Sequence, residues 1–143
     1  MDLVDELKNL LNRTATYSSC GGGNSFIQLF EFDKGYVLWI AWWWEIWRYG
    51  ELIACANDDD TPVIGKMAKA ASRLVGKRLL GINIDPDYSL GLFFEDGYEF
   101  WTFTDEPDKL YDGFYYWEFV NWISRTAYTI NSDREVVVSS ADE

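Results

Sequence analysis

Hydrophobic side chains recur at a helical spacing at the start of the chain. Positions i, i+1, i+4, i+7 and i+8 are occupied by Leu3, Val4, Leu7, Leu10 and Leu11. This spacing places the apolar side chains on one face of a helix. Acidic residues occupy the first turns of the same segment, where the helix dipole favours them. The pattern therefore predicts a helix over residues 2–12.

A second helical stripe follows a run of turn-forming residues. Its apolar members are Val63, Met67, Ala70, Ala71 and Leu74, and the stripe ends near Gly76. Asp60 or Thr61 is suited to cap the N-terminus of this helix, and Pro62 suits its first turn. Basic side chains recur on the same helix at spacings of three and four, at Lys66, Lys69, Arg73 and Lys77. We expect a helix with one basic stripe.

Runs rich in aromatic and β-branched residues favour strands in the rest of the chain. The expected strands cover residues 26–33, 36–44, 47–56, 78–85, 89–95, 98–104 and 135–138. Residues 114–123 fit either a helical stripe or a strand, and their aromatic content favours the strand. The last five residues are expected to fray. Asp96-Gly97 between two of the strands is a strong hairpin signal, because a tight turn there needs positive φ angles.

The sequence overlays on itself when it is shifted by 62 residues. Gly35-Tyr36 then falls on Gly97-Tyr98, and Trp39 falls on Trp101. The same shift lays the first predicted helix on the second. Two unrelated aromatic hairpins would also look alike, so a duplication is one of two interpretations. We expect a single α+β domain over residues 1–143, mainly antiparallel sheet, built from two similar helix-plus-meander halves at about 1–60 and 62–123. Two helices are expected to pack on the sheet.

Composition removes several classes of function. The 143 residues include no histidine, which excludes Ser-His-Asp catalysis and most zinc sites. Two cysteines, Cys20 and Cys55, are too few for a disulfide framework. The net charge of −12 disfavours general nucleic-acid binding, which needs a basic surface. These features indicate a binding protein rather than an enzyme, with no cofactor or metal.

The chain carries no recognisable targeting or membrane segment. Its first residues are acidic, unlike the basic start of a signal peptide. The longest apolar run, residues 36–44, is far shorter than the ~20 residues that span a bilayer. We expect a cytoplasmic protein that is a monomer or weak dimer and has neither a membrane nor a nucleic acid as partner.

Negative charge is concentrated in one part of the chain. Ten carboxylates and a single lysine lie between Asp85 and Glu118. An acidic face can steer a basic partner, although high charge can also serve solubility alone. The predicted partner-binding residues are Asp105, Glu106, Asp108, Tyr111 and Asp112, with Asp58, Asp59 and Asp60 as a second group.

Three consecutive tryptophans form the most unusual stretch. On a strand, Trp42 and Trp44 would share one face and Trp43 would lie on the other. One interpretation is a central strand that is covered on both sides. The alternative is an exposed aromatic patch, because tryptophan is enriched at binding hot spots. Trp42 and Trp44 are therefore added to the predicted partner-binding residues.

Part of the second half resembles small bacterial immunity proteins. The residues that carry this resemblance are Gly76-Lys77-Arg78-Leu79-Leu80-Gly81, the apolar run that ends in Asp96-Gly97, and Tyr116-Trp117-Glu118. The first half departs from the pattern, since Lys34-Gly35 stands where Asp-Gly would be. Such proteins accompany polymorphic and contact-dependent growth inhibition toxins. The resemblance implies an acidic α+β protein that neutralises a basic toxin domain, with a nuclease favoured, by covering its active site or substrate groove.

Two other functions remain open from the sequence. An acidic phage-type inhibitor that mimics nucleic acid, of the anti-restriction or anti-CRISPR kind, would explain the charge. A small-ligand or carbohydrate-binding module would explain the tryptophans. Paired carboxylates beside tryptophans also occur in glycosidases, but spacing along a strand does not establish the required geometry.

Overall fold

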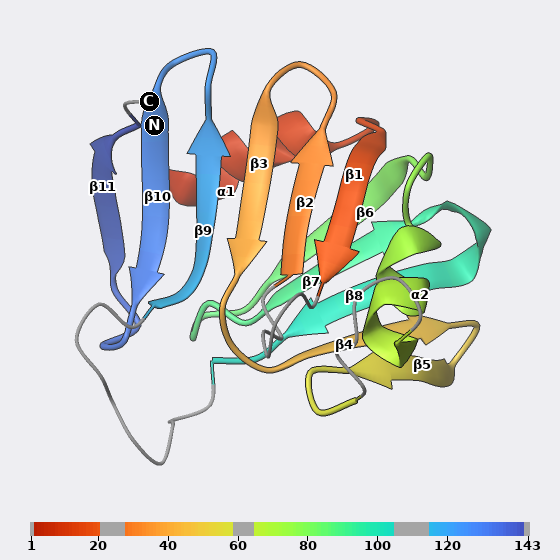
Figure 1. Ribbon diagram of the computed structural model, residues 1–143. Coiled ribbons are helices and arrows are strands. Elements are labelled where there is room, and N and C mark those ends of the chain that lie inside the picture. Colours follow the sequence, from red (N-terminus) through yellow and green to blue (C-terminus); the bar gives the residue numbers. More distant parts are fainter. Residues whose placement is uncertain (1, 21–27, 59–64, 105–114, 142–143) are drawn as a thin grey trace.

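Antiparallel β-sheet dominates the part of the chain that the computed structural model describes, namely residues 2–20, 28–58, 65–104 and 115–141. Six strands form one sheet in the order β1-β2-β3-β9-β10-β11 (Figure 1). Their bounds are Ala15–Cys20, Gln28–Phe32, Tyr36–Ile40, Tyr115–Asn121, Thr126–Asn131 and Val136–Ser140.

The second sheet has five strands in the order β5-β4-β8-β7-β6. In that order the bounds are Glu51–Cys55, Trp44–Arg48, Tyr98–Thr102, Leu90–Phe94 and Leu79–Ile84. Every pairing in both sheets is antiparallel. The expected class, α+β with mainly antiparallel sheet, agrees with this architecture.

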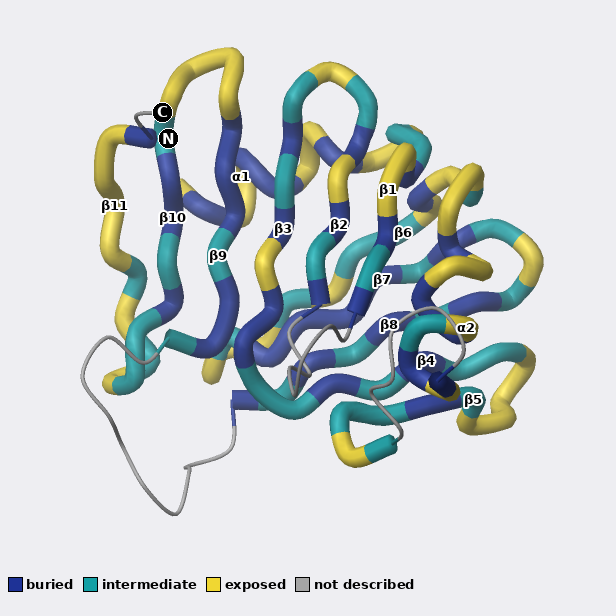
Figure 2. Tube along the Cα trace, viewed as in Figure 1, coloured by how far each residue is buried: buried dark blue, intermediate teal, exposed yellow. Residues whose placement is uncertain are grey.

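The two sheets share one aromatic core. Their strands run in crossing directions in Figure 1, and the buried segments of both sheets are dark blue in Figure 2. Phe30 of β2 meets Phe100 of β8 edge to face, with ring centroids 4.9 Å apart. Trp44 and Trp117 are fully buried in the same core. Removing one aromatic side chain from such a core costs about 3–5 kcal/mol in the free energy of unfolding.

The chain leaves the six-stranded sheet and enters the five-stranded sheet within three residues. β3 ends at Ile40 and β4 begins at Trp44, so the prediction of one strand over residues 36–44 is wrong. Hydrogen bonds hold the corner on both sides: Ala41 N donates to Tyr116 O (2.8 Å), and the Thr102 hydroxyl donates to Trp43 O (2.8 Å). The apolar run serves two sheets in succession, which explains why both of its faces are hydrophobic.

Other boundaries differ from the sequence-based expectation in smaller ways. The expected strand over 47–56 is divided by a turn at Tyr49-Gly50, where both residues have positive φ. The strand expected over 114–123 is confirmed as β9. β10 was not predicted. The expected frayed end is wrong for residues 139–141, because β11 runs to Ser140 and Ala141 is buried.

Both predicted helices form but are short. α1 spans Leu3–Leu7 and continues as the 3₁₀ turn η1, Lys8–Leu10, and the Asp2 side chain caps its N-terminus. α2 spans Lys66–Ser72 and contacts β1 and β5 (Figure 1). The predicted caps Asp60 and Thr61 lie outside the described residues. No helix in the described segments has the length and apolar character that a membrane crossing requires.

Backbone hydrogen bonds join the segments that follow the two helices. Asn12 N donates to Leu79 O, and Gly76 N donates to Ala15 O. The donor–acceptor distance is 2.7 Å in each bond. An antiparallel bridge between Thr14 and Arg78 lies between these bonds. β2 and β7 start and end 62 residues apart, as do β3 and β8. The junction therefore ties the start of β1, an edge strand of the six-stranded sheet, to the start of β6, an edge strand of the five-stranded sheet.

The Asp96-Gly97 hairpin is confirmed between β7 and β8. Asp96 has φ 64° and Gly97 has φ 78°, the signs that a tight hairpin turn requires. Lys34 and Gly35 between β2 and β3 also have positive φ. Tyr49 packs directly over Gly97, and its backbone N–H donates to Gly97 O.

We expect Gly97→Ala to destabilise the protein more than Gly50→Ala does. Both glycines have φ near +79°, so each alanine costs about 1–2 kcal/mol in backbone strain. A Cβ at Gly97 would also lie 2.2 Å from the Tyr49 ring, whereas nothing lies within 4 Å of one at Gly50. Urea unfolding of the two variants measures the difference. Equal losses would show that Tyr49 does not rest on the turn.

Candidate functional site

The outer face of the five-stranded sheet carries a dense set of aromatic and acidic side chains. We call it the aromatic face. It consists of Trp43, Glu45 and Trp47 at β4, Glu99, Trp101 and Phe103 at β8, and Phe93 of β7. Each of these side chains is partly exposed, whereas their neighbours Trp44, Ile46 and Phe100 are fully buried. Alternation along the strands thus sends one set into the core and the other set outward.

Strand register brings the outward residues together in a checkerboard. Trp47 lies opposite Glu99, and Glu45 lies opposite Trp101. Directly opposed side chains on one face of an antiparallel pair have Cβ atoms about 5 Å apart. Each carboxylate therefore lies beside an indole of the neighbouring strand as well as one of its own strand.

The glutamates hold the indole rings by hydrogen bonds. Glu45 accepts from the indole N–H of Trp43 (3.0 Å) and from that of Trp47 (2.9 Å), one on each carboxylate oxygen. Glu99 accepts from the indole N–H of Trp101 over 3.0 Å. The N–H groups of three indoles are thus paired within the face, and the exposed parts of their rings can contact another molecule.

Trp101 lies at the centre of the packing on this face. Its ring meets Phe93 edge to face with centroids 5.5 Å apart, and lies nearly parallel to Phe103 at 6.3 Å. The indole rests on Gly91, where a Cβ would lie 2.6 Å from the ring. Gly91 is needed here for a close approach, since only glycine leaves space for the ring.

The acidic residues predicted as partner contacts are mostly outside the described residues. Asp105, Glu106, Asp108, Tyr111 and Asp112 lie there, and so do Asp59 and Asp60. Their role stays a prediction.

Asp58 of the second acidic group is described, and it is engaged locally. One of its carboxylate oxygens accepts a hydrogen bond from Cys55 N at a distance of 2.7 Å, and this bond closes the turn after β5. The other lies 3.8 Å from Lys66 Nζ. Asp58 therefore orders the end of β5 as well as carrying charge.

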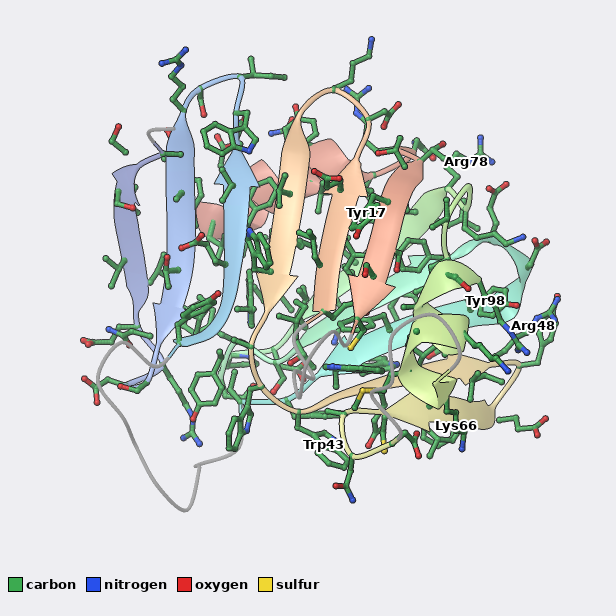
Figure 3. All side chains as sticks on the ribbon, in the orientation of Figure 1. Tyr17, Trp43, Arg48, Lys66, Arg78 and Tyr98 are labelled. Atoms are coloured by element: carbon green, nitrogen blue, oxygen red, sulfur yellow. The ribbon has the colours of Figure 1, made fainter. Side chains whose placement is uncertain are left out.

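The three consecutive tryptophans occupy three different environments. Trp44 is fully buried and stacks on Phe100, so it has no surface to offer a partner. Trp42 is partly exposed and meets Tyr116 edge to face. Trp43 lies at the lower end of the molecule as drawn in Figure 3, and with Trp42, Ala56 and Asn57 it lines a pocket of about 250 Å³. Trp42 packs against the same core that contains Trp44, whereas Trp43 belongs to the aromatic face. The role of Trp42 and Trp44 in partner binding stays a prediction.

The sequence contains a local signal for the aromatic face. Glu45-Ile46-Trp47 and Glu99-Phe100-Trp101 share the pattern Glu-x-Trp. On a strand this spacing places the carboxylate and the indole on the same face, within hydrogen-bonding reach. What the sequence could not give was the pairing of β4 with β8.

The described residues offer little for catalysis or metal binding. They contain no group of three or more cysteine, aspartate and glutamate side chains placed to hold a metal ion. The Cys55 thiol has a raised pKa, caused first by its burial and then by nearby Asp58 and Glu45. A thiol that is protonated at neutral pH is a poor nucleophile.

Comparisons with protein-family models, curated proteins and solved structures gave no match to this chain.

We expect Gly91→Ala to displace the Trp101 indole without unfolding the protein. The added methyl group collides with the ring, and overpacking of this kind costs about 1–3 kcal/mol. The indole N–H signal of Trp101, assigned with Trp101→Phe, should shift in a ¹⁵N-correlated NMR spectrum as its bond to Glu99 changes. Gly81→Ala is the control, because its Cβ would lie 3.4 Å from the nearest atom of Phe93. An unmoved Trp101 signal in Gly91→Ala would contradict this packing.

Proposed function

We propose that this chain is an immunity-type protein that binds a basic toxin domain through the aromatic face and neutralises it. The observation that carries the proposal is the checkerboard of indoles and carboxylates formed by Glu45, Trp47, Glu99 and Trp101. Tryptophan is the residue most enriched at binding hot spots. A face that places several of them in one array, partly exposed and held by hydrogen bonds, is suited to a protein partner.

The carboxylates indicate the chemistry of the partner. Glu45 and Glu99 each carry a negative charge among indole rings, and both the carboxylate and the ring face attract a cation. An arginine or lysine side chain from a partner can therefore lie over an indole while it pairs with the neighbouring glutamate. The carboxylates of the aromatic face also add a local electrostatic attraction, which raises the association rate of a basic partner. A basic toxin domain, with a nuclease favoured, fits these requirements.

The proposal also includes the cellular location and the oligomeric state of the protein. It acts in the cytoplasm as a monomer or weak dimer, without a cofactor, a membrane or a nucleic acid as partner. Inhibition follows from covering the toxin's active site or substrate groove. The acidic segment with Asp105, Glu106, Asp108 and Asp112 follows the last strand of the aromatic face in sequence, which makes it a second candidate contact.

We also propose that the chain arose by duplication, with each half completing the other half's sheet. The 62-residue offset of β2 and β3 from β7 and β8 supports this proposal. The bonds Asn12 N to Leu79 O and Gly76 N to Ala15 O match each other at an offset of 64 residues, as do the bounds of β1 and β6. Trp39 and Trp101 would then be equivalent residues on opposite outer faces, each beside a glutamate. This equivalence provides a matched control.

A carbohydrate or small-ligand-binding role is the second candidate, favoured by the pocket beside Trp42 and Trp43. Sugars commonly stack on exposed aromatic rings, but the indole N–H of Trp43 is already paired with Glu45. The paired indole N–H groups are therefore not available as donors to sugar hydroxyl groups, whereas the carboxylates and ring faces attract a cation. A glycan screen by thermal shift would identify this function.

We expect Trp101→Ala to weaken toxin binding much more than Trp39→Ala. The probe is the protein encoded by the gene directly upstream, co-expressed with this chain and then measured by calorimetry. Loss of a hot-spot tryptophan costs about 2 kcal/mol or more, about thirtyfold in Kd. Trp39→Ala removes the same side chain from the other sheet, where Trp39 is 38% exposed.

Growth of cells that carry the toxin gives the functional measurement. Wild-type protein and Trp39→Ala should protect the cells, and Trp101→Ala should not. Circular dichroism of each variant checks the fold. If the wild-type chain neither binds nor protects, the immunity function is refuted. If Trp39→Ala alone loses binding, the function stands and the face is the other one.

A further inference from the structure

A groove between α2 and the β4–β5 hairpin concentrates positive charge in this acidic protein. It has a volume of about 640 Å³ and is lined by Arg48, Lys66 and Arg73 together with Tyr49, Glu51 and Leu52. We call it the basic groove. In Figure 3, Arg48 and Lys66 lie beside α2 at the same end of the molecule. Three cations and one carboxylate give this groove a positive charge, while the whole chain carries −12.

Arg48 is held in place before any ligand arrives. Its Nε donates to Asp96 O over 3.2 Å, and its guanidinium carbon lies 4.7 Å from the centre of the Tyr98 ring and 5.3 Å from that of Tyr49. Lys77 pairs with Asp96 on the same turn, which lowers the pKa of Asp96 and keeps its carboxylate charged. An arginine fixed by its Nε and by two rings keeps its terminal amino groups oriented.

The cations of the basic groove lack strong internal partners. Within the described ranges, no carboxylate lies within ion-pair distance of Arg48 or Arg73, and Lys66 reaches Asp58 only at 3.8 Å. Glu51 lines the groove but forms no ion pair with them. Cations gathered without counter-charges repel one another, and an anion between them removes that repulsion.

The fold itself does not require a basic helix at this place. α1 precedes β1 and α2 precedes β6, the two strands that the junction of backbone hydrogen bonds joins. α1 has Asp5 and Glu6 in its first turn, whereas α2 has Lys66 and Lys69 along its length and Arg73 at its C-cap. Two helices in corresponding positions therefore differ in the sign of their charge. Architecture alone does not explain the basic residues of α2.

We propose that the basic groove binds a phosphate-bearing ligand of nucleotide size. Guanidinium groups form paired hydrogen bonds with phosphate oxygens, and the oriented Arg48 is suited to such a bond. Arg73 and Lys66 add charge from the opposite wall. Tyr49, which is 75% exposed, offers a ring face on which a base can stack. Glu51 disfavours a purely anionic ligand and favours one that also carries hydrogen-bond donors, such as a nucleobase with amino groups.

Titration with ATP and with inorganic pyrophosphate tests this proposal. We expect both to bind at low ionic strength with Kd below about 1 mM, and ATP to bind more tightly than pyrophosphate. Arg48→Gln and Arg73→Gln should each weaken binding of both probes about tenfold. Tyr49→Leu should weaken ATP binding more than pyrophosphate binding, because it removes the stacking ring for the base as well as one of the two rings that hold Arg48. Arg73 is exposed and makes no described side-chain contact, so its substitution leaves the fold intact.

Arg125→Gln is the matched control, because it removes the same charge from an exposed turn between β9 and β10. If this variant weakens binding as much as Arg73→Gln, attraction by overall charge explains the result and the proposal is overturned. Absence of binding by both probes at low ionic strength also overturns it. Trp101→Ala should leave the titration unchanged, so this outcome is separate from that of the toxin-binding experiment.

Discussion

Two strand pairings determine the structure: β3 with β9 and β4 with β8. Each joins strands that are far apart in the sequence, and each completes a sheet that the local meander leaves unfinished. Without them, β2 would still pair with β3 and β7 with β8. Neither meander would then have the additional strands that complete its sheet. Long-range pairing of this kind is slow to form, because the chain loses loop entropy before the contacts compensate for it. The buried aromatic core provides that compensation, with Phe30 and Phe100 at the contact between the sheets.

The sequence predicted the local elements better than their assembly. Helical spacing identified α1 and α2, and Asp96-Gly97 located a hairpin, because both signals come from neighbouring residues. The apolar run over residues 36–44 gave an ambiguous pattern. A strand buried on both faces and a strand that changes sheets give the same hydrophobic pattern, so the corner at residues 41–43 could not be distinguished from a central strand.

The candidate site likewise depends on a strand pairing that the sequence does not reveal. Glu-x-Trp on β4 and on β8 is visible in the sequence, but it becomes one surface only when the register places Trp47 opposite Glu99. Conversely, Trp44 appeared suitable for binding by composition and is fully buried. Residue type indicates what a side chain can contact. The face of the sheet on which the side chain lies determines whether the side chain can reach a partner. That face depends on where the strand begins.

The two proposed contacts, a basic protein at the aromatic face and a phosphate-bearing ligand at the basic groove, lie on separate surfaces of opposite charge. The aromatic face presents carboxylates between indoles, and the basic groove presents Arg48, Lys66 and Arg73 beside α2. Screening over about 8 Å at physiological salt limits the influence of exposed charges to their own neighbourhood. Each surface therefore attracts its ligand largely through its local charge, and the overall charge of −12 does not prevent anion binding at the groove. On this basis, a phosphate-bearing ligand and a basic protein partner do not compete for the same residues.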